Sequence, residues 1–206
     1  MKQTINIGAY GWQHAHWSGR FYPEDLPPEW QLTYYSNEFN TVMVPTDAWI
    51  AGSDADSEQW LDSVHEKFRF YVQCDVQVFA GMTMDACISR LAPLKPQLAA
   101  LVFLGDEQLL EKAEKAAFES LSRSLDCELI GIDCECSGIT VWRPGERSWP
   151  EVNSSLAYLE TELTDLRAVR AVFDEFIRQL SNDDGQSASL PAHALNNGCL
   201  LYTSPS

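Results

Sequence analysis

The stretch TINIGAYGWQHAHWSGRFYPEDLP (Thr4–Pro27) decides the fold class. Its first seven residues form an apolar-rich run that is followed by glycine, which predicts a buried β-strand over residues 4–10. A long loop follows that is rich in glycine, proline and aromatic rings. The first helix is expected over residues 29–39, because proline is well tolerated at the start of a helix and two prolines stand just before it. A buried strand, a loop and a helix form the first unit of an α/β pattern.

The same alternation continues along the chain. Continuous apolar strands separated by helices are typical of a parallel sheet that is covered by helices. The number of these units favours an α/β fold of the closed, TIM-like (β/α) barrel type over a small open sheet. Further strands are expected over residues 40–45, 69–75, 98–105, 128–135, 154–163 and 190–198, and further helices over residues 56–68, 84–91, 106–125 and 164–180.

One segment does not fit a regular barrel. Between residues 136 and 154 the chain is too short for a parallel strand with its crossover helices. The segment ITVWRP (residues 139–144) is expected to pair back on the fifth strand as a hairpin. The barrel is therefore predicted to be abridged between its fifth and seventh strands.

The end of the sequence has a different character from the rest. The last eight residues, CLLYTSPS (residues 199–206), match one reading frame of a widely used sequencing-library adapter. We therefore expect a single barrel domain over residues 1–198 and a non-native tail over residues 199–206.

The charge of the chain limits its partners. With 30 acidic and 14 basic residues it carries a formal net charge of −16. Such a surface repels nucleic-acid phosphates and anionic lipid, and the sequence has no basic cluster, so neither nucleic acid nor membrane is expected as a partner. The first residues lack the apolar segment of a secretory signal, which predicts a cytoplasmic protein with six reduced cysteines.

The segment from Gly8 to Val42 resembles the YecE-like family, the domain of unknown function 72. That family has a Gly-x-x-Gly-Trp motif after the first strand, then Trp, Phe-Tyr-Pro, a helix with paired tyrosines, and Phe-Asn-Thr-Val. The resemblance implies a TIM-like barrel but no established reaction. The matching residues here are Gly8, Gly11, Trp12, Trp17, Phe21, Tyr22, Pro23, Tyr34, Tyr35, Phe39, Asn40, Thr41 and Val42.

The sequence departs from that family at the ends of four strands. The family's Glu-x-Asn after Thr-Val is replaced around Met43 and Pro45, and its lysine after Phe-x-Phe by Gln73. Its Glu-x-Arg corresponds to Asp133 and Glu135, and its Tyr-Val-Arg to residues 158–160. Strand ends hold the site in a barrel, so a site that bound an anion through Lys and Arg would be lost here.

Candidate site residues follow from these positions. His14, Asp133 and Glu135 are candidate acid and base groups, because paired carboxylates and a histidine at strand ends can exchange protons. Both carboxylates could equally form a solvated acidic rim. The first loop supplies the candidate ligand-binding residues, although its rings could also serve only as packing and its arginine could pair with Asp25. These residues are Trp12, His16, Trp17, Arg20 and Tyr22.

Three functions remain open at this stage. The sequence favours binding of a small polar or ring-bearing ligand at the C-terminal mouth of the barrel. A small-metabolite enzyme that uses His14 and Asp133 is the second possibility, and a metal-dependent phosphoesterase, by analogy of fold alone, is the third. No cofactor is predicted. No metal site is predicted either, because the cysteine and histidine spacings match no known metal motif.

Overall fold

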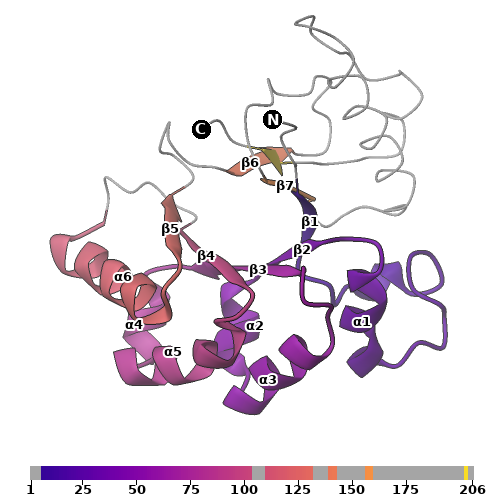
Figure 1. The fold of residues 1–206 in the computed structure, drawn as a ribbon, viewed down its shortest axis with the longest axis horizontal. Coiled ribbons are helices and arrows are strands. Elements are labelled where there is room, and N and C mark those ends of the chain that lie inside the picture. The colour runs from indigo at the N-terminus through magenta and orange to yellow at the C-terminus, as the bar shows by residue number, and fades with distance from the viewer. Residues whose placement is uncertain (1–5, 104–109, 132–138, 143–155, 160–201, 204–206) are drawn as a thin grey trace, which may run out of the picture.

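A computed structural model describes residues 6–103, 110–131, 139–142, 156–159 and 202–203 of the chain (Figure 1). The first five strands alternate with helices, as predicted. The strands are β1 (Asn6–Tyr10), β2 (Thr41–Val44), β3 (Arg69–Cys74), β4 (Leu98–Phe103) and β5 (Glu128–Gly131). The helices are α1 (Gln31–Ser36), α2 (Thr46–Ala51), α3 (Asp54–Asp62), α4 (Gln77–Gly81), α5 (Met84–Leu91) and α6 (Lys112–Leu125).

Three short 3-10 helices and three more strands complete the described elements. The 3-10 helices are η1 (Ala15–Trp17), η2 (Pro28–Trp30) and η3 (Ala92–Leu94). The strands are β6 (Ile139–Trp142), β7 (Leu156–Leu159) and β8 (Tyr202–Thr203).

The strands form one sheet in the order β5-β4-β3-β2-β1-β7-β6-β8. Strands β1 to β5 pair in parallel, with Gly8 opposite Thr41 and Thr41 opposite Arg69. Helices α1 to α6 all lie on one side of these five strands in Figure 1. This arrangement confirms the predicted α/β class with a parallel sheet. Closure of the sheet into a barrel stays a prediction.

The predicted hairpin of residues 139–144 on the fifth strand is wrong for the described part of that segment. Strand β6 pairs in parallel with β7 and antiparallel with β8. Strand β7 in turn pairs in parallel with β1, with Asn6 opposite Leu156. Hydrogen bonding of β6 is therefore satisfied on the β1 side of the sheet, away from β5. The helix expected over 164–180 and the strand over 190–198 lie outside the described residues.

Local capping explains where two helix predictions missed the boundaries. Helix α3 begins two residues before the predicted start, because Ser53 and Asp56 form a reciprocal capping box at its N-terminus. Helix α6 begins only at Lys112, where Glu111 and Glu114 form the equivalent box. The helix was expected from residue 106, but residues 110 and 111 are not helical. Residues 106–109 lie outside the described residues. The short helices α2 and α4 were not predicted.

The core on the β1 side is built from aromatic rings. The ring of Tyr35 stacks on Phe39 with centroids 4.9 Å apart and lies parallel to Trp17 at 6.5 Å. The Tyr35 hydroxyl accepts a hydrogen bond from Ala9 N at 2.7 Å and donates one to the Thr41 carbonyl at 2.8 Å. One buried side chain thus joins α1 to both β1 and β2, and it fixes the start of the loop that follows β1.

Strands β1 and β2 approach each other closely at Gly8. A Cβ atom at this position would lie 2.2 Å from the Thr41 carbonyl oxygen. Real atoms do not approach so closely, so only glycine fits here without movement of the backbone. The first glycine of the quoted stretch therefore has a packing role inside the sheet.

Candidate functional site

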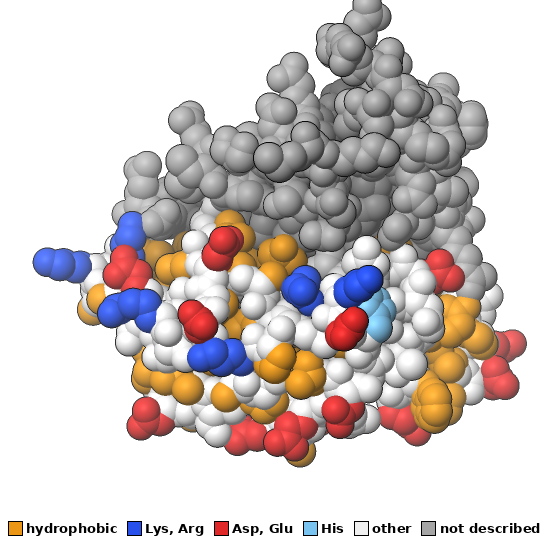
Figure 2. Space-filling model, in the orientation of Figure 1, with side chains coloured by type: hydrophobic (Ala, Val, Ile, Leu, Met, Phe, Trp, Pro, Cys, Tyr) orange, Lys and Arg blue, Asp and Glu red, His pale blue; other side chains and the backbone are white. Residues whose placement is uncertain are grey.

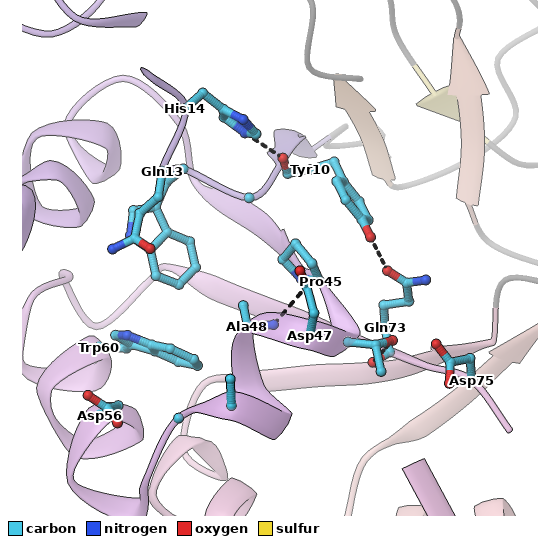
Figure 3. A pocket seen from close by; sticks show the side chains of 15 residues that line it. Tyr10, Gln13, His14, Pro45, Asp47, Ala48, Asp56, Trp60, Gln73 and Asp75 are labelled. Carbon is cyan, nitrogen blue, oxygen red and sulfur yellow. Dashed lines mark hydrogen bonds between the residues drawn. The ribbon is translucent and has the colours of Figure 1, made fainter. Parts of the chain in front are cut away.

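A cleft of about 850 Å³ lies at the C-terminal ends of the first three strands (Figure 3). Strand β1 ends at Tyr10, β2 is followed by Pro45, and Gln73 and Asp75 lie at the end of β3; all four residues line the cleft. Residues of α2 and α3 complete the wall. The carboxyl ends of parallel strands meet at one edge of a sheet, and this edge is where α/β proteins place their sites.

The chain turns into the cleft at Gly11. Its φ of 72° belongs to the left-handed region, which glycine adopts without strain. The Gly11 N–H donates to the Met43 carbonyl at 2.8 Å, which ties the turn to β2. A Cβ atom on Gly11 would lie 3.4 Å from His14 Nε2 and 3.5 Å from Pro45 Cγ. These are ordinary van der Waals distances, so the positive φ is what favours glycine here.

His14 lies at the mouth of the cleft, above this turn (Figure 3). Its Nε2 lies 2.8 Å from the Tyr10 carbonyl oxygen. A carbonyl oxygen can only accept, so Nε2 carries the proton in this contact. The imidazole also packs against the Trp17 ring, with centroids 4.3 Å apart. These contacts hold His14 in one orientation at the cleft, where it was expected.

Two tryptophans form the apolar wall of the cleft. Trp12 is only 4% exposed and meets Trp60 edge to face, with ring centroids 5.2 Å apart. Trp60 belongs to α3 and is half-buried. The sequence marked Trp12 as a ligand-binding candidate but did not mark Trp60. Both residues line the cleft.

Trp17 and Tyr22 lie in the core behind the loop instead of lining the cleft. Both are almost fully buried, and their rings pack on each other with centroids 5.7 Å apart. The Tyr22 hydroxyl donates to the Trp12 carbonyl at 2.6 Å. Burial, together with the nearby Tyr35, raises the pKa of Tyr22 well above its ordinary value, so this phenol stays neutral. Tyr22 therefore supports Trp12 from below the loop, and Trp17 packs against Tyr22.

The remaining candidates do not come together in the described structure. Arg20 is exposed and is absent from the cleft lining. His16 lies in η1, and nothing further is described of its side chain. Asp133 and Glu135 lie outside the described residues, so their proposed pairing with His14 stays a prediction.

Gln73 was noted in the sequence only as a substitution, and it proves central to the cleft. Its side-chain Oε1 accepts a hydrogen bond from the Tyr10 hydroxyl (Figure 3). Its main-chain carbonyl accepts hydrogen bonds from Trp49 Nε1 at 2.8 Å and from Thr46 Oγ1 at 3.1 Å. The same residue therefore joins β1 to β3 and anchors α2 at the cleft. Its place at a strand end was the signal that could have identified it.

Three aspartates also line the cleft, and each is held by a local hydrogen bond. Asp47 Oδ1 accepts from Ala48 N at 3.0 Å, and Asp75 Oδ1 accepts from Gln77 N at 2.8 Å. Asp56 Oδ2 accepts from the Ser53 N–H at 2.5 Å and from Ser53 Oγ at 2.7 Å. These bonds from Ser53 lower the pKa of Asp56 below its ordinary value.

The described residues hold no group of three His, Cys, Asp or Glu side chains that could bind a metal ion. Nothing in this part of the chain therefore favours the metal-dependent alternative. Within the same residues, no helix is both long and apolar enough to cross a membrane.

A parallel α/β sheet with a cleft at its strand ends defines the class of protein to which this chain belongs. Residues 6–129 match the family model described as "Protein of unknown function DUF72". The chain is therefore a member of the DUF72 family, as its first forty residues indicated. No protein of curated function matches the sequence.

Solved structures of other DUF72 family proteins are similar to this chain. A protein from Thermotoga maritima is 22% identical, with a TM-score of 0.47 over 62% of this chain and 55% of that chain. A protein from Enterococcus faecalis V583 is 15% identical, with a TM-score of 0.43 over 62% of this chain and 50% of that chain. The matched part of this chain thus spans about half the length of these proteins.

Proposed function

We propose that this protein binds a small, polar, ring-bearing ligand in the cleft at the ends of β1, β2 and β3. The observation that supports this most directly is the combination of the tryptophan wall with polar groups that converge from three strand ends. Ligand sites are concave, largely apolar in lining, and supplied with a few fixed polar groups. The cleft of about 850 Å³ lies within the usual range for a drug-sized ligand.

The two ends of the cleft offer different contacts (Figure 3). At one end, the half-buried ring of Trp60 stands against the edge of Trp12 and supports stacking of a ring from the ligand. At the other end, the hydrogen bond from Tyr10 to Gln73 Oε1 leaves the amide N–H groups of Gln73 to donate to an acceptor on the ligand. A ligand with one ring and one polar group satisfies both ends.

Two positions at which this sequence departs from the family pattern lie in this cleft. Pro45 stands where the family usually has the asparagine of its Glu-x-Asn, and Gln73 stands where it usually has a lysine; both residues line the cleft. We infer that the ligand of this chain differs in charge from one that a lysine would bind.

A thermal-shift screen of the full chain tests the proposal. The library contains sugars, sugar phosphates, nucleosides, amino acids and aromatic amines. A ligand at about 100 times its Kd adds roughly 2.7 kcal/mol to the free energy of unfolding. In a domain of this size the melting temperature should rise by about 5 to 10 °C.

The variant Gln73→Leu tests whether a ligand found in the screen binds in the cleft. It keeps the main-chain carbonyl that anchors Trp49 and removes only the amide. Its matched control is Gln31→Leu in α1, which is not part of the cleft lining. A ligand whose shift is lost in Gln73→Leu and kept in Gln31→Leu binds at the proposed place. If no compound shifts the folded protein, or if hits survive Gln73→Leu unchanged, the proposal fails.

A further inference from the structure

We propose that the cleft selects ligands that carry a positive charge, so that its natural ligand is a ring-bearing amine or a related cation. This inference rests on the proposed function, because it names the class of ligand for the same cleft. It depends on the charges that line the cleft and on the ring that faces it.

All charged side chains in the cleft lining are carboxylates. Asp47, Asp56 and Asp75 come from three different parts of the chain, and neither lysine nor arginine occurs among the lining residues of the described structure. His14 donates from Nε2 to the Tyr10 carbonyl, a bond that the neutral and the protonated imidazole form equally well, and one imidazolium would still leave the carboxylates in excess. The three carboxylates therefore set a negative potential inside the cleft.

Arg90, whose charge acts on Asp56, forms its hydrogen bonds outside the cleft. Arg90 of α5 donates from Nη1 to the carbonyls of Trp49 and Ile50, at the end of α2. Its Nε lies 4.0 Å from Asp54, an exposed carboxylate that does not line the cleft. Arg90 contributes attraction to Asp56 but does not itself line the cleft. The guanidinium therefore stabilises the end of α2 through its main-chain carbonyls. The lining of the cleft retains its three carboxylates.

Local hydrogen bonds hold the carboxylates in place without using all of their oxygens. Asp47 and Asp75 each accept a main-chain N–H through Oδ1, and Asp56 accepts from Ser53 through Oδ2. Among the described residues, no other hydrogen bond reaches the second oxygen of any of the three carboxylates. An ammonium group is a strong donor with no acceptor of its own, so it matches these remaining oxygens.

The aromatic wall adds a second, independent attraction for a cation. Trp60 and Asp56 are four residues apart on α3, so both side chains stand on the same face of that helix. Trp12 contacts Trp60 edge to face and also lines the cleft. A cation above an indole face gains cation–π attraction, and tryptophan gives the strongest such attraction of any side chain. The indole ring of Trp60 and the carboxylate of Asp56 therefore both attract the cationic group of a ligand bound beside α3.

A charge series on a constant ring tests this inference by calorimetric titration of the full chain. The first series is D-glucosamine, D-glucose and D-glucose 6-phosphate; the second is phenethylamine, 2-phenylethanol and phenylacetate. We expect the cationic member of at least one series to bind at least tenfold more tightly than the neutral member, and the anionic member to bind most weakly. This preference should shrink as salt is raised from about 0.01 to 0.5 M.

Variants that remove a negative charge but keep the local hydrogen bonds test whether the charge preference arises in the cleft. Asparagine retains the Oδ1 acceptor, so Asp47→Asn and Asp75→Asn should fold normally. Each should weaken the cationic probe by about three- to tenfold and leave the neutral probe unchanged. Asp62→Asn, at the exposed end of α3, is the matched control and should change neither. Gln73→Lys, which adds one positive charge beside three carboxylates, should reduce the preference for the cationic member.

The outcomes separate this inference from the proposed function. If neutral or anionic members bind as tightly as cationic ones, the charge preference is overturned and the binding function stands. If binding of the cation is unaffected by both asparagine variants, the charge preference does not arise in the cleft. If no member of either series binds to the folded protein, the proposed function is overturned together with this inference.

Discussion

The phenol of Tyr22 donates its proton to the main-chain carbonyl of Trp12 at 2.6 Å, from a position that is almost fully buried. This bond supports the loop after β1 from inside, at the residue that supplies the cleft with its tryptophan wall. The role of Tyr22 in the cleft is therefore indirect. It holds Trp12 where Trp60 can contact it.

Replacing Tyr22 by Phe tests this role. The variant leaves the buried Trp12 carbonyl without its donor, which should lower the free energy of unfolding by about 1 to 3 kcal/mol. Urea denaturation followed by circular dichroism measures the change. Tyr34→Phe is the control, since its ring packs on Phe21 and Tyr22 but is only half-buried. Equal stability of Tyr22→Phe and the parent protein would contradict this account of the bond.

Gly8 should tolerate no side chain. In Gly8→Ala the new Cβ would meet the Thr41 carbonyl oxygen at 2.2 Å, so β1 and β2 must separate. We expect a loss of more than about 3 kcal/mol, near the upper end for single substitutions. Gly81→Ala is the matched control, because a Cβ at that position has no atom within 4 Å. Thermal melts of both variants provide the comparison, and similar melting temperatures would refute the close approach.

The protein should lose stability in alkali as Tyr71 ionises. Burial, and to a smaller extent Glu128, raise the pKa of Tyr71 to about 12 in the folded state. Because the folded pKa lies above the ordinary value of 10.0, the stabilisation is complete below pH 10 and is lost as the pH rises towards 12. Denaturant titrations between pH 9 and 12 measure this loss. The decline should be shallower in Tyr71→Phe, and an identical decline in both proteins would exclude Tyr71 as its source.

Trp60 should contribute to ligand binding and Trp30 should not. Trp60 lines the cleft against Trp12, whereas Trp30 on η2 is 59% exposed and absent from the cleft lining. We expect Trp60→Ala to weaken the binding of a ring-bearing ligand by about fivefold or more, since ring stacking contributes about 1 kcal/mol. Trp30→Ala should bind as the parent does. Titration with whichever compound the screen identifies gives both constants, and equal losses in the two variants would point to a general effect on folding.

The surface around these elements carries charges of both signs in the space-filling view (Figure 2). Exposed acidic and basic side chains are interspersed there with apolar ones, and no extended basic area is visible on this face. The net charge of −16 predicts that phosphate-rich partners are repelled.

The apolar strands were the most predictable part of the fold. Val42, Val72 and Leu101 lie in strand-forming segments of the sequence, and each is fully buried in a strand of the parallel sheet. All of β2 is buried, whereas buried and more exposed residues alternate along β3. The pairing of β6 was not predictable, because the segment ITVW carries no information on which neighbour it will meet. Partner choice between strands depends on distant segments, which a local pattern does not report.

The candidate site was predicted in its location and only partly in its residues. Trp12 and His14 follow the first strand directly, and the rule that sites lie at strand ends was enough to identify them. Gln73 and Asp75 obey the same rule, but a glutamine and an aspartate at a strand end have no distinctive motif. Trp60 came from a helix whose spacing indicated packing, because a half-buried ring gives the same pattern whether it faces a cleft or a core.

The position of β1 in the middle of the sheet has a consequence for how the chain folds during synthesis. Strand β2 is synthesised about 30 residues after β1. Leu156 of β7, which pairs with Asn6, is synthesised about 150 residues after Asn6. At roughly 5 to 20 residues per second, that interval is on the order of 10 to 30 s. The edge of β1 that pairs with β7 stays without its partner strand during this time. Pairing between segments so far apart in the sequence also slows folding.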